Sequence, residues 1–189
     1  MNQPKLEVDS KAIWDHISGS LLLEVICRNR SEEALFTLDR HWTQNDQGKP
    51  VWDPRAPYRF IHPGSLHVLF GCAPIFDNMS VSNMYIPHAT RILPGSEILL
   101  RGSIPIPVKE YSPFFPDRAD TEYERLQLSS VAVIVQYVLP DSRCKIDPSF
   151  IDPAAWWVRA PFDATLSARG ETQVAPFEAI RRKDAIARA

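Results

Sequence analysis

Two histidines flank a predicted turn in the segment His62-Pro63-Gly64-Ser65-Leu66-His67. If residues 63–66 form a four-residue hairpin loop, His62 and His67 are the first cross-strand pair, with Cβ atoms about 5 Å apart. Two imidazoles at that distance could form half of a zinc or copper site, with His88 or a carboxylate as the third ligand. The alternative is a surface turn whose rings bind water. Because no HxH, HExxH or cupin-like spacing accompanies the pair, we predict neither a metal nor a cofactor.

Asp39 and His41 occupy alternate positions of an apolar-patterned segment, which places both side chains on one face of a predicted strand. A carboxylate that orients an imidazole is part of a nucleophilic triad or a general base. No GxSxG elbow supplies the nucleophile, and a solvated polar face is the alternative. Cys72 could be a nucleophile, but nothing near it in sequence would lower the thiol pKa, so a buried structural cysteine is favoured.

Aromatic residues gather in two proline-rich segments, 52–58 and 111–116. Exposed aromatic and arginine side chains are typical of binding surfaces, and proline-stiffened loops add preorganisation. The alternative is that these rings cover the ends of the hydrophobic core beneath long loops. The candidate ligand-binding residues are Trp42, Trp52, Arg55, Tyr58, Tyr111 and Phe114.

The composition excludes several classes of protein. The chain of 189 residues contains 17 prolines against 7 glycines, the reverse of the usual proportions. So many prolines exclude a helical bundle, and the widely spaced glycines exclude both a GxGxxG dinucleotide turn and a GxxxxGK phosphate loop. The net charge of −2, without a basic stripe, argues against a nucleic-acid partner.

Cysteine usage and hydropathy predict a cytoplasmic protein. The three cysteines are widely spaced, unlike a disulfide framework or a CxxC metal site, and Cys27 is predicted to lie in the core. Residues 1–10 lack the apolar region of a secretory leader, and no run approaches the roughly 18 apolar residues of a membrane span. These patterns predict a reducing environment and no membrane partner.

Period-two alternation of apolar residues from Leu21 to Val138 predicts strands over most of the chain. Segments 21–28 and 34–42, separated by the polar turn Asn29-Arg30-Ser31-Glu32, are predicted to pair as an antiparallel hairpin. Segment 126–139 has apolar residues on both faces, which predicts a central strand.

About nine short strands with regular turns predict an all-β fold, an antiparallel β-sandwich with long proline-rich loops. The first strand–turn–strand pattern, and Pro94-Gly95-Ser96 before a long alternating strand, resemble immunoglobulin-like and fibronectin-like sandwiches. The resemblance implies a fold and no functional residue. Residues 1–175 are predicted to form a single sandwich domain. Residues 176–189 are predicted to be a C-terminal tail, with a short helix over 177–189.

These features together predict a binding or accessory module. Its stiff aromatic and proline-rich loops, mainly within residues 42–60, would contact a protein partner or a small apolar or aromatic ligand. The alternative is an enzyme on a β scaffold, a cyclase, isomerase or hydrolase, that uses Asp39, His41, His62 or His67 as acid–base groups at a cavity mouth. A homo-oligomer formed through sheet edges and the C-terminal helix also stays open.

Overall fold

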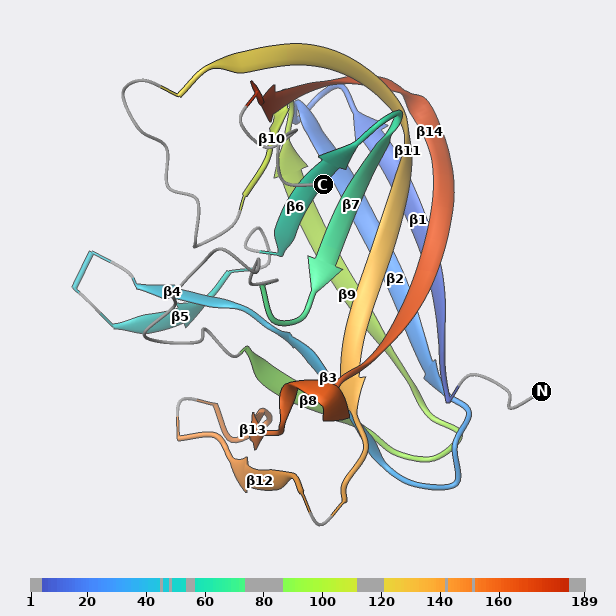
Figure 1. The fold of residues 1–189 in the computed structure, drawn as a ribbon, viewed down its shortest axis with the longest axis vertical. Helices are drawn as coiled ribbons and strands as arrows, with labels where there is room; N and C mark the ends of the chain where they lie inside the picture. Colours follow the sequence, from blue (N-terminus) through green and yellow to red (C-terminus); the bar gives the residue numbers. More distant parts are fainter. Residues whose placement is uncertain are drawn as a thin grey trace.

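Alternating apolar and polar residues fold most of the described chain into strands (Figure 1). The computed structural model describes residues 5–44, 46–47, 49–53, 57–73, 87–111, 121–141, 143–150 and 152–183. The strands in these ranges are β1 (Leu6–Asp15), β2 (Ser20–Asn29), β3 (Leu35–Arg40), β4 (Trp42–Gln44), β5 (Pro50–Trp52), β6 (Tyr58–His62), β7 (Ser65–Phe70), β8 (His88–Ile92), β9 (Glu97–Pro105), β10 (Val108–Lys109), β11 (Tyr123–Val138), β12 (Lys145–Pro148), β13 (Trp156–Arg159) and β14 (Leu166–Arg182). A short 3-10 helix covers Phe162–Ala164. No helix within the described ranges has the length and apolar character that crossing a membrane requires.

The smaller of the two main sheets has the order β1-β2-β9, and both of its strand pairs are antiparallel. Gly19, with a φ of 63°, turns the chain between β1 and β2 in a left-handed conformation that favours glycine. Every second residue of β2 from Leu21 to Cys27 is buried. Burial raises the pKa of the Cys27 thiol to about 12, and the predicted core position of this side chain is confirmed.

The larger sheet is mixed rather than purely antiparallel. Its strands follow the order β10-β14-β11-β3-β8-β13-β12, with β7 paired to β11 and β6 to β7. The predicted central strand lies within β11, which has β14 on one side and both β7 and β3 on the other, so its central position is confirmed. The antiparallel prediction is wrong for two pairs, β7 with β11 and β10 with β14, because β7 and β10 reach their partners through long connections.

The two sheets pack on each other and share one hydrophobic core, to which β1, β2 and β9 contribute from one side and β11 and β14 from the other (Figure 1). β1 crosses close to β14. A Cβ on Gly170 would lie only 3.0 Å from the Val8 carbonyl oxygen and the Ser10 hydroxyl. A glycine at this position therefore allows the close approach of the two strands.

The predicted hairpin of segments 21–28 and 34–42 is wrong. β2 pairs with β1 and β9, whereas β3 pairs with β8 and β11 in the other sheet. The turn between β2 and β3 crosses from one sheet to the other. The side-chain amide of Asn29 fixes this turn by donating to the carbonyl oxygens of Glu33 and Ile92. Two adjacent alternating segments have the same local pattern whether they pair or face each other across a core.

Residues 177–182 form the end of β14 and not the predicted helix. Phe177 lies opposite Leu128 of β11, Ala179 lies opposite Leu126, and both Phe177 and Ala179 are fully buried. Because main-chain pairing with β11 requires period two, it overrides the helical spacing of the apolar residues. β14 also passes through the predicted boundary between residues 175 and 176, and residues 184–189 lie outside the described chain.

Candidate functional site

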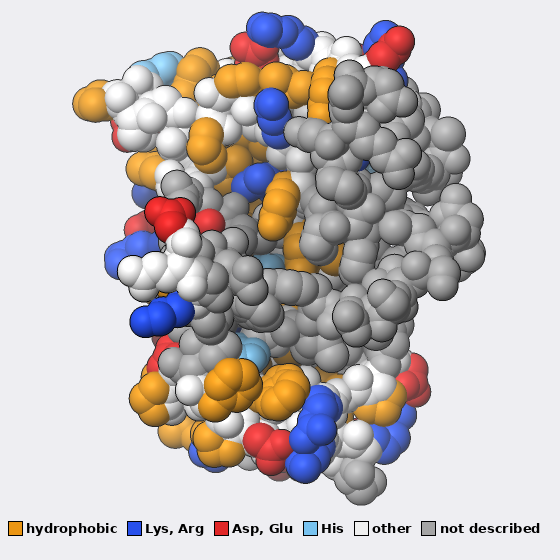
Figure 2. All heavy atoms as spheres, turned by 90° about the vertical axis from the view of Figure 1, so that its left-hand side faces the viewer, with side chains coloured by type: hydrophobic (Ala, Val, Ile, Leu, Met, Phe, Trp, Pro, Cys, Tyr) orange, Lys and Arg blue, Asp and Glu red, His pale blue; other side chains and the backbone are white. Residues whose placement is uncertain are grey.

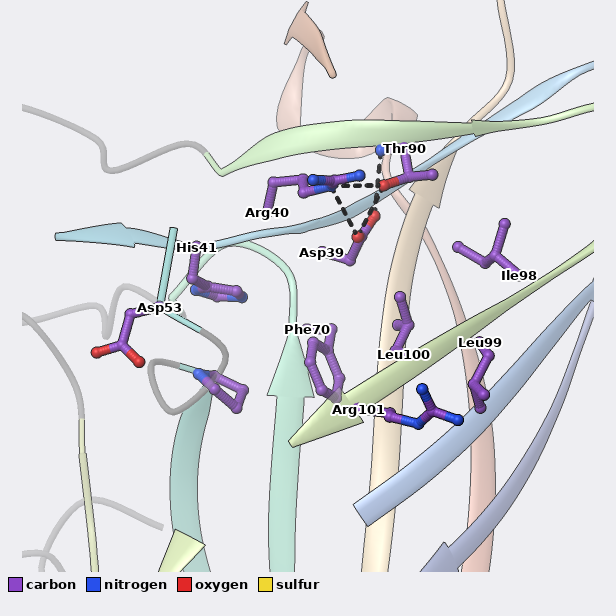
Figure 3. Close-up of a pocket in the computed structure, with 11 residues that line it drawn as sticks. Asp39, Arg40, His41, Asp53, Phe70, Thr90, Ile98, Leu99, Leu100 and Arg101 are labelled. Atoms are coloured by element: carbon purple, nitrogen blue, oxygen red, sulfur yellow. Dashed lines mark hydrogen bonds and ion pairs between the residues drawn. The ribbon is translucent and has the colours of Figure 1, made fainter. Parts of the chain in front are cut away.

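A cavity of about 390 Å³ opens beside β9, at the ends of β3 and β7 (Figure 3). Residues 39–41 and Thr90 line it on the side of β3 and β8, and residues 98–101 line it on the side of β9. Phe70 lies between these two walls in Figure 3, and Asp53 and Pro57 complete the lining. The cavity therefore meets the predicted contact segment 42–60 at its edge.

The carboxylate of Asp39, buried in one wall of the cavity, accepts hydrogen bonds from two threonines. The Thr37 hydroxyl donates to it at 2.7 Å, and the hydroxyl and main-chain N–H of Thr90 donate at 2.8 and 3.1 Å. Arg40 Nε lies 3.7 Å from the carboxylate and donates to the Thr90 hydroxyl at 3.0 Å, while Nη1 donates to Asp152 at 3.2 Å. Burial raises the pKa of Asp39, whereas the hydrogen bonds and Arg40 act in the opposite direction. These bonds make the β3/β8 wall a closed polar network.

His41 is almost completely buried, with 4% of its surface exposed. Its ring packs edge-on against Tyr58 and Phe70, at centroid distances of 4.8 and 6.3 Å. The Gly71 N–H points at Nε2 over 3.4 Å, which assigns the ring proton to Nδ1. Burial lowers the pKa of His41 to about 4, so the imidazole is neutral at pH 7.

Asp39 and His41 line the same cavity, yet Asp39 does not orient the imidazole. The register with β8 shifts between Thr37 and Arg40, so the end of β3 departs from regular alternation. Asp39 accepts its side-chain hydrogen bonds from Thr37 and Thr90 instead. The two predicted acid–base residues are therefore neighbours without the hydrogen bond that a catalytic dyad needs.

His62 and His67 also lie close together, but in a different register from the predicted one. The loop between β6 and β7 is Pro63-Gly64 instead of residues 63–66, and His62 is paired with Ser65. The histidines are therefore diagonal neighbours, and their rings stack with centroids 4.0 Å apart and planes inclined by 28°.

The described residues do not complete a zinc or copper site around the two stacked histidines. Burial, followed by the charges of His62 and Arg169, lowers the pKa of His67 to about 4. His88, the third candidate ligand, lies in β8 with Nδ1 at 2.9 Å from the Ser149 hydroxyl. Among the residues that the structure describes, no group of three or more His, Cys, Asp and Glu side chains could hold a metal ion.

The predicted aromatic contact residues have different environments. Tyr58 is only 2% exposed and packs with Leu69, so its ring belongs to the interior. Tyr111 is 40% exposed, stacks on Tyr58 at 6.2 Å and carries the Arg59 guanidinium 5.0 Å from its centroid. The backbones of Trp42 and Trp52 pair in the hairpin of β4 and β5. Their side chains lie outside the described structure, as do Arg55 and Phe114.

Two groups of residues at the surface were not predicted as functional. One is the stretch of β9 that lines the cavity, whose acid–apolar–base pattern, Glu97 to Arg101, was a signal in the sequence. The other lies on the face shown in Figure 2, where hydrophobic and basic side chains gather near β12 and β13. Phe150 is 79% exposed there, and the Arg159 guanidinium lies 5.1 Å from the Trp157 ring centroid.

Comparison of the chain with protein-family models, with curated proteins and with solved structures found no match.

Proposed function

We propose that this protein is a binding module that holds an apolar or aromatic group, of a protein partner or a small ligand, in the cavity beside β9. A volume of about 390 Å³ suits such a group, since small-molecule sites measure roughly 300–1,000 Å³. Phe70, Pro57 and Leu100 supply apolar surface, and Asp39 and Arg40 supply polar groups in fixed positions. This combination of apolar lining with few, immobilised polar groups is the observation that carries the proposal.

We also propose that the scaffold is a sandwich of the immunoglobulin or fibronectin type. Its support is the strand order. β1, β2 and β9 in one sheet and β14, β11 and β3 in the other follow the A-B-E and G-F-C order of constant-type immunoglobulin domains. We place the protein in the cytoplasm, without nucleic-acid or membrane partners. The free thiols of Cys27, Cys72 and Cys144 and the net charge of −2 support this placement.

A cavity-filling variant tests the binding function. Leu100→Trp places an indole in the cavity, and Leu22→Trp is the matched control because Leu22 is 37% exposed on the same sheet and does not line the cavity. We expect indole and small aliphatic alcohols to shift the amide NMR signals of Phe70 and Thr90 in the natural protein and in Leu22→Trp. Leu100→Trp should abolish these shifts. The proposal is wrong if no probe binds, or if binding survives Leu100→Trp.

Among the predicted contact residues with described side chains, Tyr111 is accessible to a partner and Tyr58 is not. If the loops contribute to a partner surface, Tyr111→Ala should weaken partner binding without loss of thermal stability. Tyr58→Ala, in contrast, should destabilise the fold because Tyr58 is buried.

An enzyme is the second candidate, favoured by the presence of both Asp39 and His41 in the cavity lining. A buried carboxyl group with a raised pKa can donate or accept a proton next to a bound substrate. A screen of ester, lactone and enolisable ketone substrates should then show turnover that Asp39→Asn abolishes, with Asp9→Asn as the control because Asp9 is 68% exposed and does not line the cavity. Binding of the same compounds without turnover would exclude this candidate in favour of the binding module.

A further inference from the structure

Hydrogen bonds at the two ends of the β2–β9 pair show which residues of β9 direct their main-chain groups toward β2. At one end the Asn29 N–H donates to the Ser96 carbonyl at 3.0 Å, and at the other the Ile106 N–H donates to the Gly19 carbonyl at 2.9 Å. Bonded residues alternate along an antiparallel pair, and both contacts use even-numbered residues on the β9 side. Even-numbered residues of β9 therefore turn their main chain toward β2, and odd-numbered residues turn theirs away.

Leu99 and Arg101 consequently direct their N–H and C=O groups to the outer edge of the smaller sheet. Within the described parts of the chain, no strand pairs with this edge. All four consecutive residues 98–101 line the cavity, although successive side chains of a strand point to opposite faces. A cavity that contacts both sets lies beside the strand, along its open edge. Asp39 and Thr90 of the larger sheet form its far wall, so the cavity lies between the edge of β9 and the larger sheet (Figure 3).

The outer face of the smaller sheet carries two rows of charges that alternate in sign from strand to strand. The rows are Glu7-Arg28-Glu97 and Lys11-Glu24-Arg101. Ion pairs of 3.5, 2.8 and 3.6 Å connect neighbours within them. A further strand beside β9 that continued this alternation would have a basic residue opposite Glu97 and an acidic residue opposite Arg101. Between these two, it would have an apolar residue opposite exposed Leu99.

We propose that the open edge of β9 and the adjoining cavity bind an extended segment of a partner protein as an additional, antiparallel strand. The segment has the order acid, three apolar residues, base. Its central apolar residue faces Leu99, and the two flanking apolar side chains point toward the cavity. Main-chain hydrogen bonds from Leu99 and Arg101 supply affinity, while the charges and the cavity supply selectivity. This inference rests on the proposed binding function and names the class of its partner.

β9 itself has the required order, Glu97-Ile98-Leu99-Leu100-Arg101, and is therefore complementary to its own copy in antiparallel orientation. A two-fold axis at Leu99 would, however, also bring the larger sheet of a second copy against this edge, where residues 39–41 and Thr90 already form the far wall of the cavity. A single segment avoids this overlap, and we assign the edge to a segment rather than to a whole second copy.

The peptide Ser-Glu-Ile-Leu-Leu-Arg-Gly, a copy of residues 96–102, is the probe. Its addition should slow hydrogen exchange at the amides of Leu99 and Arg101, whereas those of Ile98 and Leu100 are already protected by β2. N-methylation of the central leucine should weaken binding about 10-fold or more, because that amide faces the protein. N-methylation of the next leucine, whose amide points away, is the matched control and should change affinity by less than about two-fold. Leu99→Pro in the protein should abolish binding and leave the fold intact.

Four results would overturn the proposal. Slow exchange of Leu99 and Arg101 in the free monomer would mean that the chain closes its own edge. Protection that rises with protein concentration, together with a dimer in light scattering, would mean that a second copy occupies it. Equal affinity of the two N-methylated peptides would mean that the peptide does not bind by strand addition. If the peptide fails while indole still binds in a manner that Leu100→Trp blocks, the strand inference fails and the binding function stands.

Discussion

The two walls of the cavity differ in how their polar groups are satisfied. On the β3/β8 wall, Asp39, Arg40 and Thr90 bond to one another, and Arg40 also reaches Asp152. On the β9 wall, the Arg101 guanidinium lies 3.6 Å from Glu24 with both side chains largely exposed, and the outward main-chain groups face the cavity. The β3/β8 wall is therefore part of the folded framework, whereas the β9 wall would offer its hydrogen bonds to the proposed ligand. Substitutions on the first should therefore change stability, and those on the second should change binding.

Removal of the carboxylate at the centre of the closed network should have the largest effect. Asp39→Ala leaves the Thr90 N–H without its acceptor and removes the carboxylate 3.7 Å from Arg40 Nε, and loss of one member of a buried charged network costs about 3–5 kcal/mol. Urea denaturation measures the free energy of unfolding. Asp9→Ala is the control, because this carboxylate also pairs with an arginine, Arg28, but is 68% exposed, and only a small change is expected. Equal effects of the two substitutions would contradict the structural role of the β3/β8 wall.

Acidification should lower the free energy of unfolding through protonation of His41. The pKa of this residue falls from about 6.5 in the unfolded chain to about 4 in the fold, so the unfolded chain binds more protons between these values. The stabilising contribution is complete above pH 6.5 and is lost as the pH falls toward 4, by about 3 kcal/mol in total. Urea denaturation at pH 7.0 and 4.5 measures the loss.

The matched variant for the pH experiment is His41→Gln, which keeps an acceptor and does not titrate. Asp39 contributes in the opposite direction, because its pKa is raised in the fold, and this contribution is common to both proteins. The difference between the two pH dependences therefore isolates His41. Parallel curves for the natural protein and His41→Gln would show that the imidazole is not buried as described.

The two edges of β9 can be compared directly by proline substitution. Leu100→Pro removes an N–H that pairs with β2 and should cost about 2–3 kcal/mol, because a buried carbonyl of β2 loses its donor. Leu99→Pro removes an N–H on the open edge and should change the free energy of unfolding much less. Thermal and urea denaturation of both variants measure the difference. A larger loss of free energy of unfolding for Leu99→Pro would mean that the odd-numbered residues of β9, and not the even-numbered ones, bond to β2.

The sequence predicts individual strands better than their partners. Leu21 to Cys27 and segment 126–139 were identified because buried strands leave period-two apolar patterns. β1 has the same signal, with Glu7, Asp9 and Lys11 on its outer face, and was missed because Ser10 and Ala12 weaken its inner face. Which strands pair is decided by contacts between distant segments, so neither the crossing from β2 to β3 nor the parallel pair of β7 and β11 has a local signature.

The same limit applies to the site. Asp39 and His41 were identified by residue type and spacing, and both line the cavity. Their partners were not, because Thr90 and Arg101 reach the cavity from β8 and β9 and meet β3 only in the folded chain. The predicted pairing of His62 with His67 was wrong only in its register, because Gly64, with a φ of 79°, allows a tighter loop.

A matched pair of arginines gives the smallest and most specific test of the difference between the walls. Arg40→Ala removes the donor to the Thr90 hydroxyl and to Asp152 and should cost about 1–2 kcal/mol. Arg101→Ala removes an ion pair in which the arginine is 72% exposed, so the free energy of unfolding should stay close to that of the natural protein. Binding of the acidic–apolar–basic peptide should show the opposite order, with Arg101→Ala the weaker binder because the peptide acid loses its partner. If Arg101→Ala destabilised the fold as much as Arg40→Ala, the β9 wall would belong to the folded framework as well. The cavity would then have no face left to distinguish one ligand from another by charge.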